Sequence, residues 1–168
     1  MIYAEVAPNP FRSFLGFFRG TGMSKEAIAV QAHVKDAITH LSNNQSIGAR
    51  LQEGYRLLEE VAEEHDEPNW DGYGALPINI ASLRKAYEFI QILPLSLPLP
   101  DIEVDPDGEV SFDWYDDSGG VFSVSLGESG RLTFAGAFGR KEVHGVDHFD
   151  DEIPMPILIY LQQLLGLE

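Results

Sequence analysis

Between residues 101 and 138, apolar side chains recur at every second position, and this period of two constrains the fold more than any other feature of the chain. The alternating apolar residues are Ile102, Val104, Val110, Phe112, Trp114, Phe122, Val124, Leu126, Leu132, Phe134 and Phe138. Sequences rich in Asp, Gly and Pro separate them at residues 105–108, 116–120 and 128–130. Short alternating segments joined by tight turns are typical of antiparallel strands with one buried face. The segment therefore predicts a four-stranded antiparallel meander over about residues 101–138.

Apolar residues spaced three and four apart predict helices on both sides of this meander. Helices are expected within about residues 24–93, and a last one over about residues 153–165, where apolar residues nearly encircle the axis. An apolar sheet face needs such a cover. The predicted fold class is therefore α+β, a four-stranded antiparallel β-meander packed against N-terminal and C-terminal helices. Residues 139–152 are expected to form a polar loop.

The first part of the chain differs in composition from the rest. Residues 1–23 are expected to form an irregular aromatic arm, and residues 24–168 a single α+β domain, because 168 residues suffice for one domain with a core but not for two large ones. Phe14, Phe17 and Phe18 of this arm lie between two arginines. They either pack onto the domain or form an exposed anchor for a partner.

The net charge of -16 is distributed unevenly. Residues 1–50 carry five basic and three acidic side chains, whereas residues 51–168 carry six basic and 24 acidic ones, which leaves -18 on the latter part. An acidic body repels a phosphate backbone, so direct binding to nucleic acid is not expected. The same field attracts a basic protein, but it also serves simply to keep a protein soluble.

The chain has no cysteine, which excludes disulfides, thiol nucleophiles and cysteine-based zinc sites and fits a reducing compartment. The N-terminal sequence lacks the pattern of a signal peptide, and the apolar run at residues 157–161 is too short to cross a bilayer. We therefore expect a cytoplasmic protein without a membrane span. No phosphate-binding loop, nucleophile elbow or histidine-centred triad pattern is recognisable, so no cofactor is expected and no catalytic residue is assigned.

Two sets of residues have the side chains needed for chemistry. His144, Asp147 and His148 are candidate metal ligands, because imidazole nitrogens and carboxylate oxygens suit a divalent ion. The alternative interpretation of this stretch is a polar acidic loop without a metal. Glu103 and Asp113 are expected to project from the solvent face of the meander, where they would form a pair of carboxyl groups like that of a glycosidase.

The segment at residues 69–77, Asn-Trp-Asp-Gly-Tyr-Gly-Ala-Leu-Pro, joins the helices to the meander. Trp70, Asp71 and Tyr73 are candidate partner-binding residues, because such residue types often anchor interfaces. The structural alternative is a tight joint. In that case Trp70 is buried between helix and sheet, Asp71 accepts hydrogen bonds from backbone amides, and the two glycines adopt positive φ.

This segment, followed by a proline-rich stretch at residues 94–100 and by Asp-Pro-Asp-Gly-Glu-Val-Ser-Phe-Asp-Trp at residues 105–114, resembles a group of small uncharacterised bacterial proteins. Those proteins share a Trp-Asp-Gly turn before an α+β half. The resemblance covers about residues 66–135. It implies the fold and carries no activity.

The charge distribution favours one function over two alternatives. We expect a non-enzymatic acidic interaction protein that inhibits or neutralises a basic protein partner, as antitoxins, immunity proteins and nucleic-acid mimics do. One alternative is a divalent-metal hydrolase that uses His144, Asp147 and His148. The other is a structural homo-oligomer that assembles through residues 153–165.

Overall fold

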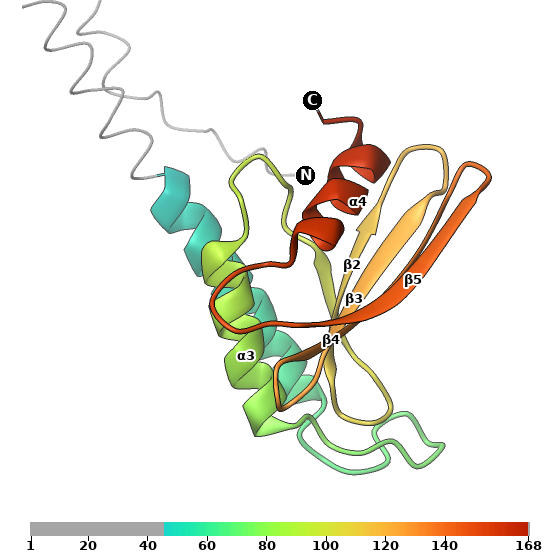
Figure 1. Cartoon of the computed structure of the whole chain (residues 1–168). Coiled ribbons are helices and arrows are strands. Elements are labelled where there is room, and N and C mark those ends of the chain that lie inside the picture. The colour runs from blue at the N-terminus through green and yellow to red at the C-terminus, as the bar shows by residue number, and fades with distance from the viewer. Residues whose placement is uncertain (1–45, 168) are drawn as a thin grey trace, which may run out of the picture. The chain divides into compact units, whose positions relative to one another are not determined.

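The computed structural model of the protein describes residues 46–167, which belong to a compact unit spanning Gln45–Glu168. A helix over residues 46–64 comes first. The elements that follow it are α3 (Ile80–Ile92), β1 (Asp101–Val104), β2 (Val110–Tyr115), β3 (Val121–Leu126), β4 (Arg131–Phe138), β5 (Lys141–His148) and α4 (Met155–Leu165) (Figure 1). The predicted aromatic arm, with Phe14, Phe17 and Phe18, and the helix expected to begin near residue 24 lie outside the described residues.

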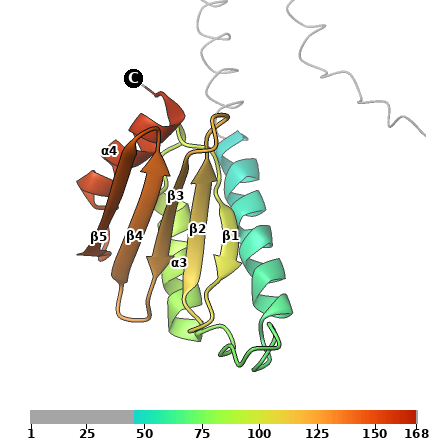
Figure 2. The same cartoon turned by 90° about the vertical axis from the view of Figure 1, so that its right-hand side faces the viewer.

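The strands form one antiparallel sheet of five strands in the order β1-β2-β3-β4-β5, so each strand pairs with the next one along the chain (Figure 2). The first four occupy the predicted segments, and the α+β class is confirmed. The prediction of four strands was wrong by one. Lys141–His148, expected to be a polar loop, pairs with β4 from Phe138↔Lys141 to Arg131↔His148. The apolar alternation that reveals β1 to β4 is missing here because β5 is an edge strand whose residues are mostly exposed.

All described helices lie on the same side of the sheet (Figures 1 and 2). Helices α3 and α4 both contact β2 and β3, the central part of the core. The ring of Phe89 on α3 stacks on that of Phe112 on β2 with centroids 4.8 Å apart, and Phe149 meets Phe89 edge-on at 5.6 Å. The alternating apolar residues of the sheet therefore face the helices, as their period predicts.

The described helices agree with their predicted positions. Asn79 caps the start of α3, because its side-chain oxygen accepts hydrogen bonds from the amides of Ala81 and Ser82. In α4, which was expected to be apolar all round, Ile157, Leu161 and Leu164 are buried. Met155 and Ile159 of α4 remain exposed, so one face of this helix is sandwiched in the fold and another is not.

A single buried hydroxyl group joins α3 to the sheet. Ser82 is fully buried, and its Oγ donates to the carbonyl oxygen of Leu126 on β3 while accepting from the N–H of Val110 on β2 at 2.9 Å. Val110 and Leu126 are register partners, so the helix meets both strands at one atom. This contact sets the height of α3 along the sheet.

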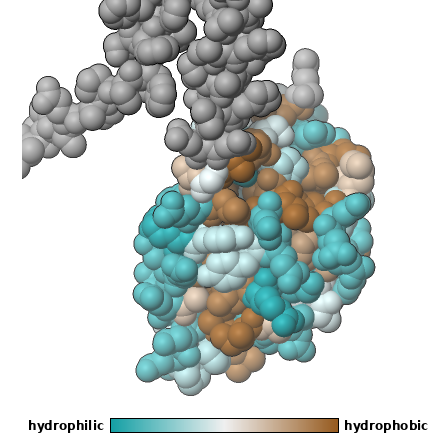
Figure 3. Space-filling view, turned by 90° about the vertical axis from the view of Figure 1, so that its left-hand side faces the viewer, coloured by the Kyte–Doolittle hydropathy of each residue, from teal (hydrophilic) through white to brown (hydrophobic). Residues whose placement is uncertain are grey.

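The outer surface of the helical side is mixed in character. Apolar areas alternate there with hydrophilic ones (Figure 3). Exposed apolar side chains of the helices and of the segment after α3 are Ile47, Ile80, Ile92, Leu95, Met155 and Ile159. Over residues 46–167, no helix combines the length and the apolar character required to cross a bilayer.

We expect Ser82→Ala to lower the free energy of unfolding by about 1–3 kcal/mol, because it leaves the buried N–H of Val110 without an acceptor and the Leu126 carbonyl without a donor. Urea denaturation measures this change. Ser129→Ala, at an exposed position in the turn between β3 and β4, is the matched control and should change the free energy little. Equal values for the two variants would show that the bridge does not stabilise the fold.

Candidate docking face on the open side of the sheet

The sheet face opposite the helices is not covered by any part of residues 46–167 (Figure 2). We call it the open face. Its strand positions follow from the register, because directly opposite residues of antiparallel strands share a face. They are Asp101, Glu103, Ser111, Asp113, Tyr115, Val121, Ser123, Ser125, Arg131, Thr133, Ala135, Ala137, Glu142, His144, Val146 and His148. Small side chains occupy the centre, so the surface is flat there.

Carboxyl groups gather where the open face crosses β1 and β2. Asp101 is the register partner of Asp113, and Glu103 lies opposite Ser111. Asp113 is only 9% exposed, although its side chain belongs to the uncovered face. The prediction that Glu103 and Asp113 project from this side of the meander is therefore confirmed. They do so among other carboxyl groups and not as an isolated pair.

Little positive charge balances these acids. Among the open-face strand positions, Arg131 is the one lysine or arginine, and its guanidinium lies 3.2 Å from the carboxylate of Glu109. Glu109 also lies near Ser125, whose hydroxyl group donates to Asp105. The single arginine is thus held at the border of the acidic area, and Asp101, Glu103 and Asp113 form no ion pair with a cationic side chain of residues 46–167.

Two residues of this acidic area, Asp105 and Tyr115, have raised pKa values. Burial raises the pKa of the Asp105 carboxyl group above its ordinary value; the Ser125 hydroxyl opposes this, while the carboxylates of Asp107, Asp113 and Glu109 add to it. Asp113 is also the largest cause of a raised pKa for the Tyr115 phenol. The acidic side chains therefore act on one another, and a bound cation would relieve their repulsion.

The segment at residues 69–77 forms a hydrogen-bonded joint between helix and sheet. The amide of Ile78 donates to the carbonyl oxygen of His65, at the end of the first described helix, at 2.8 Å. The amide of Leu76 donates to the carbonyl oxygen of Pro106, in the β1–β2 turn, also at 2.8 Å. The backbone of this one segment thus ties both elements together.

Within the joint, Trp70 and Asp71 have structural partners. The indole N–H of Trp70 donates to the carbonyl oxygen of Leu76 at 2.9 Å, and its ring meets that of His65 edge-on at 4.3 Å. Asp71 accepts from the amides of Tyr73 and Ala75 at 2.8 and 3.1 Å, and these hydrogen bonds lower its pKa. The expected capping role of Asp71 is confirmed. Trp70 was expected between helix and sheet, but it is half-buried at the helix end.

Tyr73 is the exposed member of this group. Its side chain is 95% exposed, while Asp71 holds the backbone on either side of it. The neighbouring glycines, Gly72 and Gly74, have φ values of 76° and 100°, as the tight turn requires. Of the three predicted partner-binding residues in this segment, Tyr73 is therefore the one whose side chain remains available for a partner.

The predicted metal ligands do not converge. Because side chains alternate along a strand, His144 and His148 lie on the open face and Asp147 on the other face. The two histidines are four residues apart, which corresponds to about 13 Å along a strand. His148 instead lies 3.1 Å from Asp150. Among residues 46–167 no three His, Asp or Glu side chains are grouped so that they could hold a metal ion.

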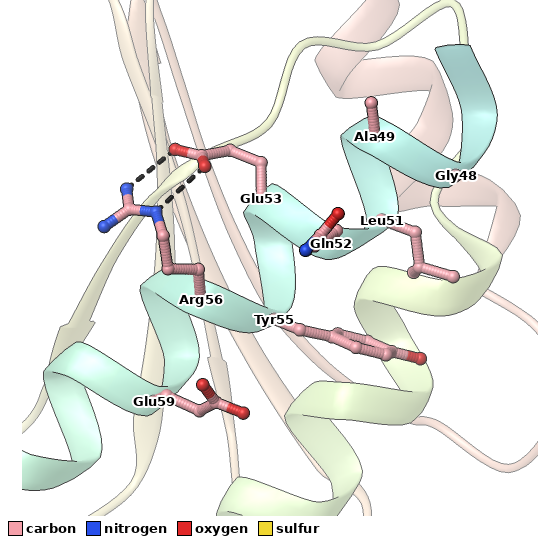
Figure 4. A pocket seen from close by; sticks show the side chains of 8 residues that line it. All are labelled: Gly48, Ala49, Leu51, Gln52, Glu53, Tyr55, Arg56 and Glu59. Carbon is pink, nitrogen blue, oxygen red and sulfur yellow. Dashed lines mark hydrogen bonds and ion pairs between the residues drawn. The ribbon is translucent and has the colours of Figure 1, made fainter. Parts of the chain in front are cut away.

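A hollow on the first described helix is also a candidate site (Figure 4). Its lining comes from one helix only and consists of Gly48, Ala49, Leu51, Gln52, Glu53, Tyr55, Arg56 and Glu59. Arg56 is already paired with Glu53 at 2.7 Å and with Glu60, and the ring of Tyr55 packs edge-on against Tyr87 of α3. Arg56 is therefore already held by carboxylates of its own helix, and the hollow has a weaker case as a docking site than the open face.

No protein-family model, curated protein or solved structure matches the chain. The resemblance to small bacterial proteins with a Trp-Asp-Gly turn therefore stays a prediction. The function has to be argued from the geometry and charge of the described residues.

We expect Trp70→Ala to lower the free energy of unfolding by about 1–3 kcal/mol, because it removes the packing on His65 and the hydrogen bond to Leu76. Thermal or chemical denaturation checks this value. Tyr73→Ala, three residues away and almost fully exposed, serves as the control and should leave stability nearly unchanged. An unchanged stability of the Trp70 variant would contradict its role in the joint.

A second prediction concerns Asp105, whose folded-state pKa is raised by burial. The folded protein then binds more protons than the unfolded chain between the two pKa values, so this group makes stability fall as pH rises through that window. Asp105→Asn should increase stability at pH 7, by at most about 1 kcal/mol because the half-exposed group is partly screened by solvent. The gain should disappear below the unfolded pKa of about 3.9.

Urea denaturation across a pH series measures the Asp105 effect. Asp117→Asn, in the exposed β2–β3 turn, makes the same chemical change away from the cluster and should leave stability at pH 7 unchanged. A destabilised Asp105 variant at pH 7 would show that the hydrogen bond from Ser125 outweighs the cost of burying the carboxylate.

Proposed function

We propose that the protein is a non-enzymatic interaction module that binds a basic protein partner on its open face. The observation that carries this proposal is a flat sheet surface, uncovered by residues 46–167, with Asp101, Glu103 and Asp113 along one side and no lysine or arginine of the described residues beside them. A partner with complementary positive charge fits such a surface.

The small side chains at the centre of the face suit this role. Ser123 and Ser125 are short and partly exposed, so the long side chains of a partner's lysines and arginines would have room to lie across them. Their charged ends would then reach the carboxylates on β1 and β2. Because these carboxylates are carried by paired strands, little conformational entropy is lost when a partner binds.

The consequence for a partner is inhibition or neutralisation. A basic surface that normally binds the phosphates of a nucleic acid would be attracted by the same negative field and blocked by it. Steering of this kind mainly raises the association rate and falls with ionic strength. The proposal thus retains the antitoxin, immunity-protein or nucleic-acid-mimic type of function expected from the charge distribution, with the open face as its site.

The test compares two variants with the same loss of charge. The open-face variant combines Asp101→Asn, Glu103→Gln and Asp113→Asn. The control combines Glu59→Gln, Glu63→Gln and Glu64→Gln on the exposed side of the first described helix. The two variants and the wild-type chain are used as baits for affinity purification from the native host at low and moderate salt. Isothermal titration calorimetry then measures the affinity of each captured protein for the three baits.

We expect a stoichiometric basic partner that the wild-type and control proteins bind equally, and that the open-face variant binds at least about tenfold more weakly, since a tenfold change corresponds to about 1.4 kcal/mol. Equal weakening by the two variants would mean that net charge, and not the open face, attracts the partner. Recovery of no stoichiometric partner at either salt concentration would contradict the proposed function.

A further inference from the structure

The two edges of the sheet are protected to different degrees. β1 has only four residues and is flanked by Pro100 and Pro106, which is a common way to prevent an edge from pairing. β5 has eight residues and no proline, and no strand of the described chain lies beyond it. An unprotected edge strand of this length is a template for pairing with another strand.

The hairpin geometry tells which backbone groups of β5 face outward. Phe138 and Lys141 close a two-residue turn, so they form a hydrogen-bonded pair, and alternate residues of β5 bond to β4 from there on. The bond from the amide of Phe149 to the carbonyl oxygen of Gly130, at 2.7 Å, follows the same alternation. The backbone groups of Glu142, His144, Val146 and His148 therefore point away from the sheet. The amide of His148 already donates to Asp147 at 2.8 Å.

The charges along this edge have opposite signs at its two ends. Arg140 and Lys141 lie at the start of β5 beside a single acid, Glu142, whereas Asp147, Asp150 and Asp151 lie at its end or just beyond it, so the start is net positive and the end net negative. A strand with such a polarity is complementary to an antiparallel copy of itself. This charge complementarity selects a second copy of the chain among the strands that might pair with β5.

We propose that β5 pairs antiparallel with β5 of a second copy of this chain, about a two-fold axis at His144. In this register Glu142 of one copy lies opposite Val146 of the other and His144 lies opposite its own copy. The outward backbone groups of these three residues, which have no partner strand within residues 46–167, are then all paired. The register also places Lys141 opposite Asp147 at both ends of the contact.

The neighbouring registers are less favourable. If the axis moves one residue toward His148, Glu142 lies opposite His148, whose amide is already bonded, and Lys141 no longer faces Asp147. If it moves one residue toward Lys141, Val146 lies opposite Arg140 in the turn. The pairing therefore has one preferred register, and it joins the two sheets and their open faces into a continuous surface.

The test exchanges charges at the two ends of the contact in the full chain. Sedimentation velocity over a dilution series should show a species of twice 18.6 kDa for the wild type. Lys141→Glu and Asp147→Lys should each raise the dimer dissociation constant about tenfold, because each puts like charges opposite each other twice. Arg84→Glu and Asp117→Lys make the same charge changes at exposed sites on α3 and in the β2–β3 turn, and should leave the dimer intact.

A mixture of the two edge variants separates this contact from a general loss of structure. Lys141 also donates to Gln163 at 2.8 Å, so its replacement changes a contact within one copy as well. When Lys141→Glu and Asp147→Lys proteins are mixed, both ends of a heterodimer again carry opposite charges, and the wild-type dissociation constant should return. Failure of the mixture to restore dimerisation would overturn the proposed register.

Hydrogen exchange provides a second readout. The amides of Glu142, His144 and Val146 should exchange more slowly as the protein concentration rises, while those of Val143 and Gly145, bonded to β4, should not change. Val146→Pro removes one outward amide without touching the β4 ladder and should abolish the dimer while the circular dichroism spectrum stays native. A mass of 18.6 kDa at every concentration would overturn the proposal. If the amides of β5 were nevertheless protected in that monomer, the protection would come from another segment of the same chain and not from a second copy.

Discussion

The hydroxyl group of Ser82 is the contact on which the arrangement of helices and sheet depends. It accepts from Val110 and donates to Leu126, so it fixes α3 against two strands at once. One turn earlier, Asn79 caps the same helix while its own amide bonds to Gly108 in the β1–β2 turn. The segment at residues 69–77 is therefore followed directly by residues that are fixed in place: Ile78 bonds to His65 at the end of the first described helix, and Asn79 bonds to Gly108.

Because the helices cover one face of the sheet, the other face is free to serve a different purpose. Its centre has small polar side chains where a second layer would require large apolar ones. On its acidic side, burial raises the pKa of Asp105, with neighbouring carboxylates adding to the effect, and the carboxylate of Asp113 is the largest cause of the raised pKa of Tyr115. Such an arrangement is unfavourable for the isolated protein, and this local cost is the physical argument for a cationic partner.

Two predictions that the structure contradicts concern the same stretch of the chain. A polar loop was expected over residues 139–152, but an edge strand such as β5 buries little on either side and shows no apolar alternation. His144, Asp147 and His148 were candidate metal ligands in the same stretch, and strand geometry separates them onto two faces.

The amino-acid sequence was sufficient to predict the elements whose residues alternate between water and core: the first four strands, the described helices, the turns between them and the cap formed by Asp71. Those predictions need only local periodicity and turn chemistry. The tertiary structure was needed to show that Ser82 bridges two strands, that β5 completes the sheet and that Asp101 lies directly opposite Asp113. These properties depend on which residues lie side by side across strands. Strand register and the packing of the helices on the sheet decide this between residues far apart in the chain, where a local sequence pattern gives no information.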